Sequence, residues 1–454
     1  MSMRKNLRLA IVSGTAVALT GGLLTLAAGT AAAAPAKYTD DFNGDGLRDY
    51  ATTGHEGFTV VYGTATGPGK RSKTFTQNSP GIPGKTGSAG GYGDSFGEEL
   101  ATGDFNRDGY GDLAVGDETE KVGKRAARGA VTIVWGSKSG LGSRATLVPV
   151  KKSSSEKRFG EALAGGDFNG DGKTDLAVAD RRSVHIYRGG FSSRTGSTGK
   201  VTQHQHDDLL EVTGIAAGKV TKDKATDLYL LGQGYTKNKM TSDAWFLRGG
   251  STIKRGPYLS YNRTEPLYGA QGVIADFDRN GYGDLALNDV PHNKDAGSVL
   301  VVRGGKSGPG TSYRITQSTA GVATSATKGD GFGGRIAVGD TNRDGYPDLA
   351  AGSPGEKVGS FKHAGGVHIL RGGKKGLTGT GSQWFTRATA GIPGDPFSYA
   401  SFGTHLGMRD VDRDGYADLL ASEYGTTSTL LRGGKDGITT TSAREIPMNA
   451  DIAP

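Results

Sequence analysis

Carboxylate-rich segments of nine residues recur along this chain with a fixed internal spacing. The first copy, residues 41–49, reads Asp-Phe-Asn-Gly-Asp-Gly-Leu-Arg-Asp, with side-chain oxygens at positions 1, 3, 5 and 9 and glycine at position 6. Hard oxygen ligands at alternate positions around a tight glycine turn suit Ca²⁺, and the carbonyl of position 7 adds another oxygen. Carboxylates this close together repel one another unless a cation lies among them. The spacing therefore predicts a structural calcium site in each complete copy.

Six complete copies keep this spacing, so we expect about six structural Ca²⁺ ions. The predicted ligands, with position 7 acting through its backbone carbonyl, are Asp41, Asn43, Asp45, Leu47, Asp49, Asp104, Asn106, Asp108, Tyr110, Asp112, Asp167, Asn169, Asp171, Lys173, Asp175, Asp276, Asp278, Asn280, Tyr282, Asp284, Asp340, Asn342, Asp344, Tyr346, Asp348, Asp410, Asp412, Asp414, Tyr416 and Asp418.

The segments differ from EF-hands, which carry a bidentate glutamate at position 12 and a helix on either side. Here position 12 is apolar or threonine, as in the run Asp-Leu-Ala-Val-Gly at residues 112–116. Short apolar runs bounded by glycine predict strands.

A seventh, degenerate copy fills the long gap between residues 175 and 276. It keeps Asp223 and Asp227 at positions 5 and 9, but Lys219 and Thr221 stand at positions 1 and 3, and glycine is missing from position 6. Because an ammonium group at position 1 opposes a cation, we expect no metal in this copy.

Each copy belongs to a longer repeat with parts in fixed order. An aromatic–glycine pair comes first, at residues 96–97, 159–160, 268–269, 332–333 and 402–403, and an alternating strand ending in glycine follows the metal segment, as in Val-His-Ile-Leu-Arg-Gly-Gly at residues 367–373. Four short strands per repeat are typical of a β-propeller blade. The repeats cover approximately residues 36–79, 93–150, 157–205, 206–262, 266–316, 330–388 and 400–448.

The aromatic–glycine start, the nine-residue loop and the Gly-Ser-Pro turn at residues 352–354 resemble FG-GAP repeats, found in the N-terminal propeller of integrin α chains and in many bacterial secreted proteins. The resemblance implies an all-β fold, a single seven-bladed propeller of four-stranded blades, with Ca²⁺ between the first two strands of a blade. The first repeat departs from the pattern because it lacks an aromatic–glycine pair, and the fourth lacks its metal loop.

The N-terminal residues 1–33 have the pattern of a secretory signal peptide. Arg4, Lys5 and Arg8 precede an apolar stretch that ends in small residues, and an uncleaved anchor helix is the alternative interpretation. We expect cleavage to leave residues 34–454 as one exported propeller without a membrane span, found outside the cell or at the cell wall. The chain has no cysteine, so bound calcium replaces disulfides as the expected source of rigidity.

The chain has a formal net charge of +8, which we interpret as a solubilising surface, although acidic polymers remain a candidate partner. Arg-Gly-Gly triplets begin at Arg188, Arg248, Arg303, Arg371 and Arg432. Such triplets bind RNA in disordered tails, but here they close strands, so we expect no nucleic-acid partner. A ring of these arginines at one level of the propeller would be able to bind anions.

Two further patterns resemble chemical sites. Residues 93–97 match G-x-S-x-G, but that motif needs a strand before the serine and a helix after it, and here the aromatic–glycine pair follows. His204 and His206 lie on one face of a predicted strand, where an outer polar strand is favoured over a transition-metal site.

These observations predict a secreted, monomeric, calcium-stabilised binding or adhesion module whose ligand is an extracellular protein or glycan. The alternatives are a secreted hydrolase of the esterase or phospholipase class and a lectin on the same propeller. No nucleophile–base set is recognised in the sequence. A charged cluster that breaks the repeat pattern at one end of the propeller would favour the enzyme.

Overall fold

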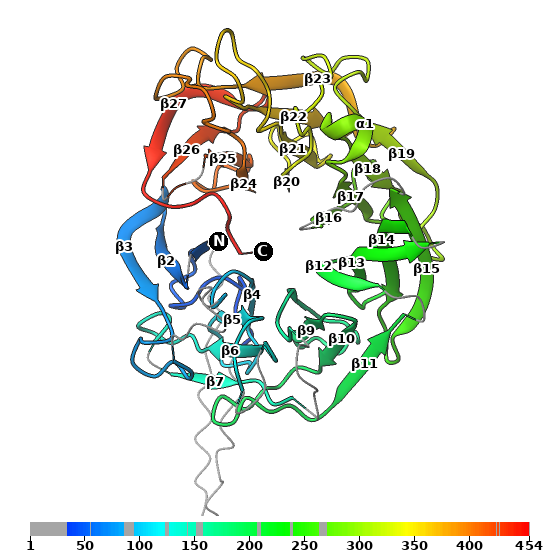
Figure 1. Ribbon diagram of the computed structural model, residues 1–454. Helices are drawn as coiled ribbons and strands as arrows, with labels where there is room; N and C mark the ends of the chain where they lie inside the picture. Colours follow the sequence, from blue (N-terminus) through cyan, green and yellow to red (C-terminus); the bar gives the residue numbers. More distant parts are fainter. Residues whose placement is uncertain are drawn as a thin grey trace, which may run out of the picture.

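The computed structural model shows an all-β molecule in which seven antiparallel sheets surround a common centre (Figure 1). The described residues are 34–54, 56–85, 95–122, 127–142, 144–150, 158–206, 210–236, 239–262, 270–423, 425 and 427–453. The predicted signal segment, residues 1–33, and the aromatic–glycine pair at residues 268–269 lie outside them.

Each sheet uses consecutive strands of the chain, so each is one blade. The strands of the first four blades are β1 (Tyr50–Gly54), β2 (Gly57–Thr64) and β3 (Gly67–Phe75); β4 (Leu100–Gly103), β5 (Asp112–Asp117), β6 (Ala130–Val134) and β7 (Ala145–Leu147); β8 (Leu163–Gly166), β9 (Asp175–Asp180), β10 (Ser183–Tyr187) and β11 (Val201–Gln205); and β12 (Glu211–Gly218), β13 (Asp227–Thr236), β14 (Lys239–Arg248) and β15 (Lys254–Asn262).

The last three blades have the same arrangement. Their strands are β16 (Gly272–Ala275), β17 (Asp284–Asn288), β18 (Val299–Val302) and β19 (Ser312–Ile315); β20 (Ile336–Gly339), β21 (Asp348–Gly352), β22 (Val367–Arg371) and β23 (Thr378–Phe385); and β24 (His405–Arg409), β25 (Asp418–Ser422), β26 (Ser428–Arg432) and β27 (Thr439–Ile446). A single short helix, α1 (His292–Asp295), is present among the described residues, and none of their helices is long or apolar enough to cross a membrane. The predicted seven-bladed β-propeller is confirmed.

The hydrophobic core lies between neighbouring blades. One core cluster combines Val131 and Ile133 of β6 with Leu176 and Val178 of β9, and the phenylalanine of an aromatic–glycine pair, Phe159, is buried among them. Phe96, Phe332 and Phe402 are buried in the same way. The phenylalanine ring of each of these four pairs therefore acts as a wedge between two sheets, which explains its fixed place in the repeat.

The antiparallel order places two kinds of connection on opposite faces of the ring. In the blades with a described aromatic–glycine pair, the first strand starts after that pair and ends at the nine-residue segment, and the next strand returns. We call the face with the nine-residue segments and the Arg-Gly-Gly hairpins the loop face. The opposite face carries the aromatic–glycine pairs and the connections between the second and third strands.

The first blade is completed by the other end of the chain. Its sheet has three strands, and a β-bridge joins Thr52 of β1 to Ile452, while the Ala453 N–H donates to the carbonyl oxygen of Ala51 at 2.8 Å. The C-terminus lies near the centre of the ring, beside the first blade (Figure 1). Residues 451–453 thus occupy the innermost position that a blade's own first strand fills elsewhere.

Candidate calcium-binding loops

The backbone of each complete nine-residue segment wraps around the carboxylate at position 1. In the first loop, Asp41 Oδ1 accepts the Asp45 N–H at 3.1 Å and Oδ2 accepts the Gly46 N–H at 2.8 Å. Asp167, Asp276 and Asp410 accept the corresponding pairs of N–H groups in their loops. These bonds hold the acidic side chains inside the turn.

The glycine at position 6 is required by its backbone conformation. Its φ angle lies between 80° and 92° in all six complete loops. This left-handed region is unfavourable for residues with a Cβ atom, and the N–H of this glycine is the one aimed at the position 1 carboxylate.

The aspartate at position 9 has a second role that the spacing alone did not reveal. Asp49 is buried, and its Oδ2 accepts the Phe42 N–H at 3.0 Å while Oδ1 accepts the Gly63 N–H at 2.9 Å. The equivalent carboxylate of every blade accepts the glycine N–H that follows the third strand. Position 9 therefore ties the loop to the neighbouring hairpin.

Burial changes the acidity of these position 9 groups. Desolvation raises the pKa of Asp49 to about 7, and the pKa values of Asp175, Asp284 and Asp418 to about 6. Since desolvation disfavours the ionised carboxylate, a cation placed beside it would favour that form. The carboxylate oxygens have lone pairs beyond those used by the two N–H groups, so the donor set fits a hard cation.

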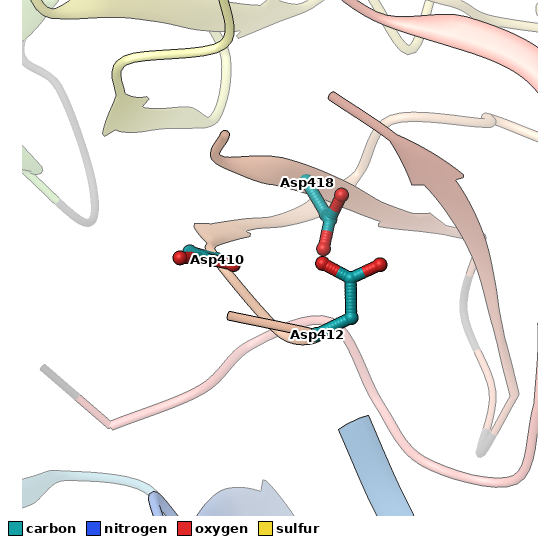
Figure 2. Close-up of side chains that lie close together, drawn as sticks. All are labelled: Asp410, Asp412 and Asp418. Atoms are coloured by element: carbon teal, nitrogen blue, oxygen red, sulfur yellow. The ribbon is translucent and has the colours of Figure 1, made fainter. Parts of the chain in front are cut away.

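The seventh loop brings its carboxylates closest together. Side-chain oxygens of Asp410, Asp412 and Asp418 lie within 4.8 Å of one another, and within the described part of the chain this is the one acidic group of that kind. Figure 2 shows the carboxylates of Asp412 and Asp418 turned toward each other, with Asp410 beside them. Four other complete loops carry asparagine at position 3 and the fifth carries Asn280 at position 5, so each has one carboxylate fewer.

Comparison with known proteins identifies the repeat. The model of the FG-GAP repeat matches residues 96–134, 159–191 and 332–370. The chain therefore carries FG-GAP repeats and resembles integrin α chains. Integrin alpha-3 of Mus musculus is 27% identical over 215 residues, which are 46% of this chain and 19% of that one. Phosphatidylinositol-glycan-specific phospholipase D of Rattus norvegicus is 28% identical over 174 residues, 37% of this chain and 20% of that one.

The chain thus spans about a fifth of the length of these curated relatives. Among solved structures, a lectin of Agrocybe aegerita that recognises non-reducing terminal N-acetylglucosamine aligns with a TM-score of 0.44 and 14% identity, covering 88% of this chain and 90% of that one.

The arginines of the Arg-Gly-Gly hairpins are bound to loop carboxylates, so the ring of free arginines considered from the sequence is not formed. Arg371 pairs with Asp348 at 2.9 Å and Arg432 pairs with Asp418 at 2.8 Å. Arg188, Arg248 and Arg303 pair with an aspartate of their own blade's loop. The pairing follows from the topology, because each hairpin lies beside the nine-residue loop of the same blade on the loop face.

The degenerate loop of the fourth FG-GAP unit contains its own cation. The Lys219 ammonium group donates to the carbonyl oxygen of Lys224, and Arg248 pairs with Asp223 at 3.1 Å. Asp227 still accepts the Thr221 and Gly249 N–H groups, so the frame of this loop resembles that of the others.

Neighbouring loops are joined by the residue at position 4. Arg279 donates to the Asp344 carbonyl oxygen of the next loop at 3.3 Å and lies over the Tyr346 ring, and Arg343 donates to the Asp414 carbonyl oxygen at 3.3 Å. Lys222 lies over Tyr282 in the same manner. We call these contacts the inter-loop clasps.

The opposite face carries an acidic cavity of about 270 Å³, lined by Glu98, Glu99, Glu118, Arg158 and Glu161 among others. Desolvation raises the pKa of Glu99 to about 8 and that of Glu161 to about 7. Arg158 pairs with Glu118 and, at 3.1 Å, with Glu161. Our sequence reasoning missed this cavity, although glutamates directly after two aromatic–glycine pairs were a visible signal.

Two sequence candidates are placed in ordinary structural surroundings. The His206 ring stacks on Tyr258 at 4.2 Å and meets Trp245 edge-on at 4.9 Å, while His204 bonds to the Thr202 hydroxyl. Ser95 of the G-x-S-x-G match is buried and is followed by β4 rather than a helix. The structure favours neither a transition-metal site nor a nucleophile elbow at these residues.

Proposed function

We propose that this protein is an extracellular binding module whose propeller is stabilised by Ca²⁺ in six loops and whose ligand binds the opposite face. The observation that carries the proposal is the repeated loop geometry, in which backbone N–H groups hold the position 1 carboxylates inward beside a buried position 9 aspartate. The bound cation would neutralise these carboxylates. The residues that would coordinate Ca²⁺ are those predicted from the spacing in the sequence. Lys219 excludes the metal from the fourth unit.

The opposite face is favoured for ligand binding because its surface is built from irregular connections that differ between blades. The connection of residues 353–366 and the connection of residues 386–404 are longer than the hairpins of the loop face. Loops held by a rigid scaffold are the usual place for binding residues. The loop face, in contrast, repeats the same carboxylate frame around the ring. We infer an extracellular protein or glycan as the ligand and export of the chain after removal of residues 1–33.

Thermal unfolding with a chelator and with millimolar Ca²⁺ tests the calcium proposal. Because Ca²⁺ binds the folded loops and not the unfolded chain, we expect a higher melting temperature with Ca²⁺, by mass action. Calorimetric titration should give about six sites, in line with the oxygen sets available. Asp108→Ala should remove one site, and Asp223→Ala, in the degenerate loop, should remove none. Equal melting temperatures with chelator and Ca²⁺ would contradict the proposal.

A secreted hydrolase is the second candidate, and the acidic cavity favours it. Carboxyl groups with raised pKa values in a cavity are typical of acid–base catalysts, and the cavity breaks the repeat pattern at one end of the propeller. Turnover of an ester, phosphodiester or glycoside that Glu99→Gln abolishes without lowering the melting temperature would establish the hydrolase. If the wild-type protein turns over none of these substrates, the binding module is favoured.

A further inference from the structure

Exposed aromatic side chains gather on two adjoining connections of the opposite face. Phe361, Phe397 and Tyr399 are 37%, 55% and 70% exposed, and they are three of the six large hydrophobic side chains exposed in the described part of the chain. The exposed His363 ring stacks on Tyr399, with centroids 5.3 Å apart and planes 18° apart. We call Phe361, His363, Phe397 and Tyr399 the aromatic platform. Such a concentration marks a binding surface rather than scattered surface residues.

Backbone hydrogen bonds hold the two connections together. The Tyr399 N–H donates to the Lys362 carbonyl oxygen at 2.8 Å, and the Ser401 N–H donates to the His363 carbonyl oxygen at 2.9 Å. Phe361 forms two backbone hydrogen bonds of 3.0 Å with Val358 across a tight turn. The rings therefore stand on a rigid frame, which lowers the entropy lost when a ligand binds.

Tyr399 occupies a backbone conformation that normally selects glycine. Its φ angle is 67°, and the residue in the same place at the preceding blade junction is Gly329, with a φ angle of 85°. The two junctions correspond because the Gly331 and Phe332 N–H groups donate to Asp295 and Ala296 as those of Ser401 and Phe402 donate to His363 and Ala364. A left-handed tyrosine costs about 1 kcal/mol more than glycine. Glycine would fit this backbone position without strain. The presence of a tyrosine there therefore points to a role for its side chain.

A cavity of about 470 Å³ lies beside the platform. His363 and Tyr399 line it together with Gly331, Gly334 and Gly355. At Gly331 the space above the backbone is free, because a Cβ atom there would have only Pro354 atoms within 4 Å, at 3.7 Å. A flat ring can therefore approach the backbone while its face packs on the tyrosine.

We propose that the aromatic platform and this cavity bind a β-1,4-linked glucopyranose chain. A pyranose with equatorial hydroxyl groups presents axial C–H groups on both faces, and these positively polarised hydrogens suit the negative face of an aromatic ring. Its hydroxyl groups at the rim match the Ser401 and Thr404 side chains that also line the cavity. A protein partner would need a contiguous patch of about 800 Å² per side. The stacked His363 and Tyr399 rings beside this small cavity suit one or two sugar rings instead.

The inference specifies the ligand class of the proposed binding module but does not depend on bound calcium. Calorimetric titration of the full chain with cellotetraose and with chitotetraose tests it, and α-1,2-linked mannotetraose is the control because its axial C–O bonds at C1 and C2 interrupt the apolar face. We expect both β-1,4-linked oligosaccharides to bind in the micromolar to millimolar range and the mannoside to bind at least about tenfold more weakly.

Tyr399→Gly separates binding from folding. Because glycine relieves the left-handed backbone, this variant should melt no lower than the wild type, yet its affinity should fall about tenfold or more. Tyr399→Phe should bind like the wild type, since stacking needs the ring and not the hydroxyl. Tyr235→Ala, which removes an exposed tyrosine of β13 outside the platform, is the matched control and should leave binding unchanged.

Three outcomes contradict the inference: no binding of either β-1,4-linked oligosaccharide by the wild type, equal binding of the mannoside, or full binding by Tyr399→Gly. Binding of a protein ligand through Tyr399, with no oligosaccharide bound, would likewise overturn it in favour of a protein partner. A chain that Ca²⁺ stabilises but that binds none of these sugars would contradict this inference and leave the calcium proposal standing. Sugar binding without stabilisation by Ca²⁺ would contradict the calcium proposal and leave this inference standing.

Discussion

His185 and His368 have the same place in their repeats but different surroundings. Each directly follows the first valine of its blade's third strand, Val184 in β10 (Ser183–Tyr187) and Val367 in β22 (Val367–Arg371). His185 lies 2.9 Å from the carboxylate of Asp180, whereas His368 is fully buried between Phe332 and Trp384 and has the Thr324 hydroxyl as its partner. Desolvation lowers the pKa of His368 to about 3. The charge state of this histidine is therefore decided by its neighbours rather than by its motif.

Protonation of His368 should destabilise the folded protein in acid. Its unfolded pKa is about 6.5, so the stability that the neutral ring contributes is fully present above that pH and is lost as the pH falls toward 3. We expect a loss of at most about 1.4 kcal/mol per pH unit in this window. Urea unfolding of the wild type and His368→Phe at about pH 7.5 and about pH 4.5 measures it.

The His368→Phe variant should lose less stability than the wild type between the two pH values. Glu99, Glu161 and Glu356 have raised pKa values and act with the opposite sign, but they are common to both proteins, so the difference isolates His368. Equal losses in the two proteins would show that His368 does not titrate in this window.

The inter-loop clasps show how one loop is positioned by the next. Arg343 has a φ angle of 57°, and a Cβ atom at Gly415 of the following loop would lie 3.1 Å from the Arg343 guanidinium. The first and third loops carry Gly44 and Gly170 at this position, also with positive φ angles. Arg343 therefore has a backbone conformation that favours glycine, but its long cationic side chain reaches the neighbouring blade. This contact offsets the backbone strain.

Comparing Arg343→Gly with Arg343→Ala separates the clasp from the strain. Both substitutions remove the contact with the Asp414 carbonyl oxygen, but alanine keeps the left-handed strain and glycine relieves it. We expect Arg343→Gly to have the higher free energy of unfolding, by about 1 kcal/mol. Chemical denaturation of both variants measures this difference. An alanine variant as stable as the glycine variant would contradict the strain interpretation.

Closure of the ring depends on a few residues from the far end of the chain. The bridge from Ile452 to β1 is accompanied by an ion pair of 2.5 Å between Arg335 and Asp451, and His405 lies 3.4 Å from the same carboxylate. Ala450 is buried between the first and last blades, and Ala453 is buried between the first and second blades. This segment fills the inner edge of the first blade and joins blades that are far apart in the sequence.

Deleting residues 449–454 should open this closure. Loss of the buried alanines and of the β1 bridge should lower the free energy of unfolding by about 2 kcal/mol or more. The uncovered edge of β1 should also promote self-association, because unpaired strand edges pair with other chains. Urea unfolding and size-exclusion chromatography measure the two effects. Removal of residue 454 alone is the control, and an unchanged free energy of unfolding in the longer deletion would show that the ring closes without this segment.

Local sequence determined the parts of this protein that depend on neighbours in the chain. The glycine at position 6 and the inward aspartates could be predicted because the loop is held by its own backbone N–H groups within nine residues. The strands and the count of seven units followed from the repeat, since each antiparallel blade is built from consecutive segments. The absence of a metal loop in the fourth unit was predicted from Lys219 for the same reason, and it remains a prediction.

Other features depend on contacts between segments that are distant in the sequence, and only the tertiary structure decided them. The pairing of Arg371 and Arg432 with aspartates of their own blades requires the hairpin to fold back beside the loop. The place of Ile452 against Thr52 requires the ring to close, and the stack of His363 on Tyr399 requires two blades to adjoin. No local pattern encodes these contacts, because they form only when burial of the wedge phenylalanines packs the blades side by side.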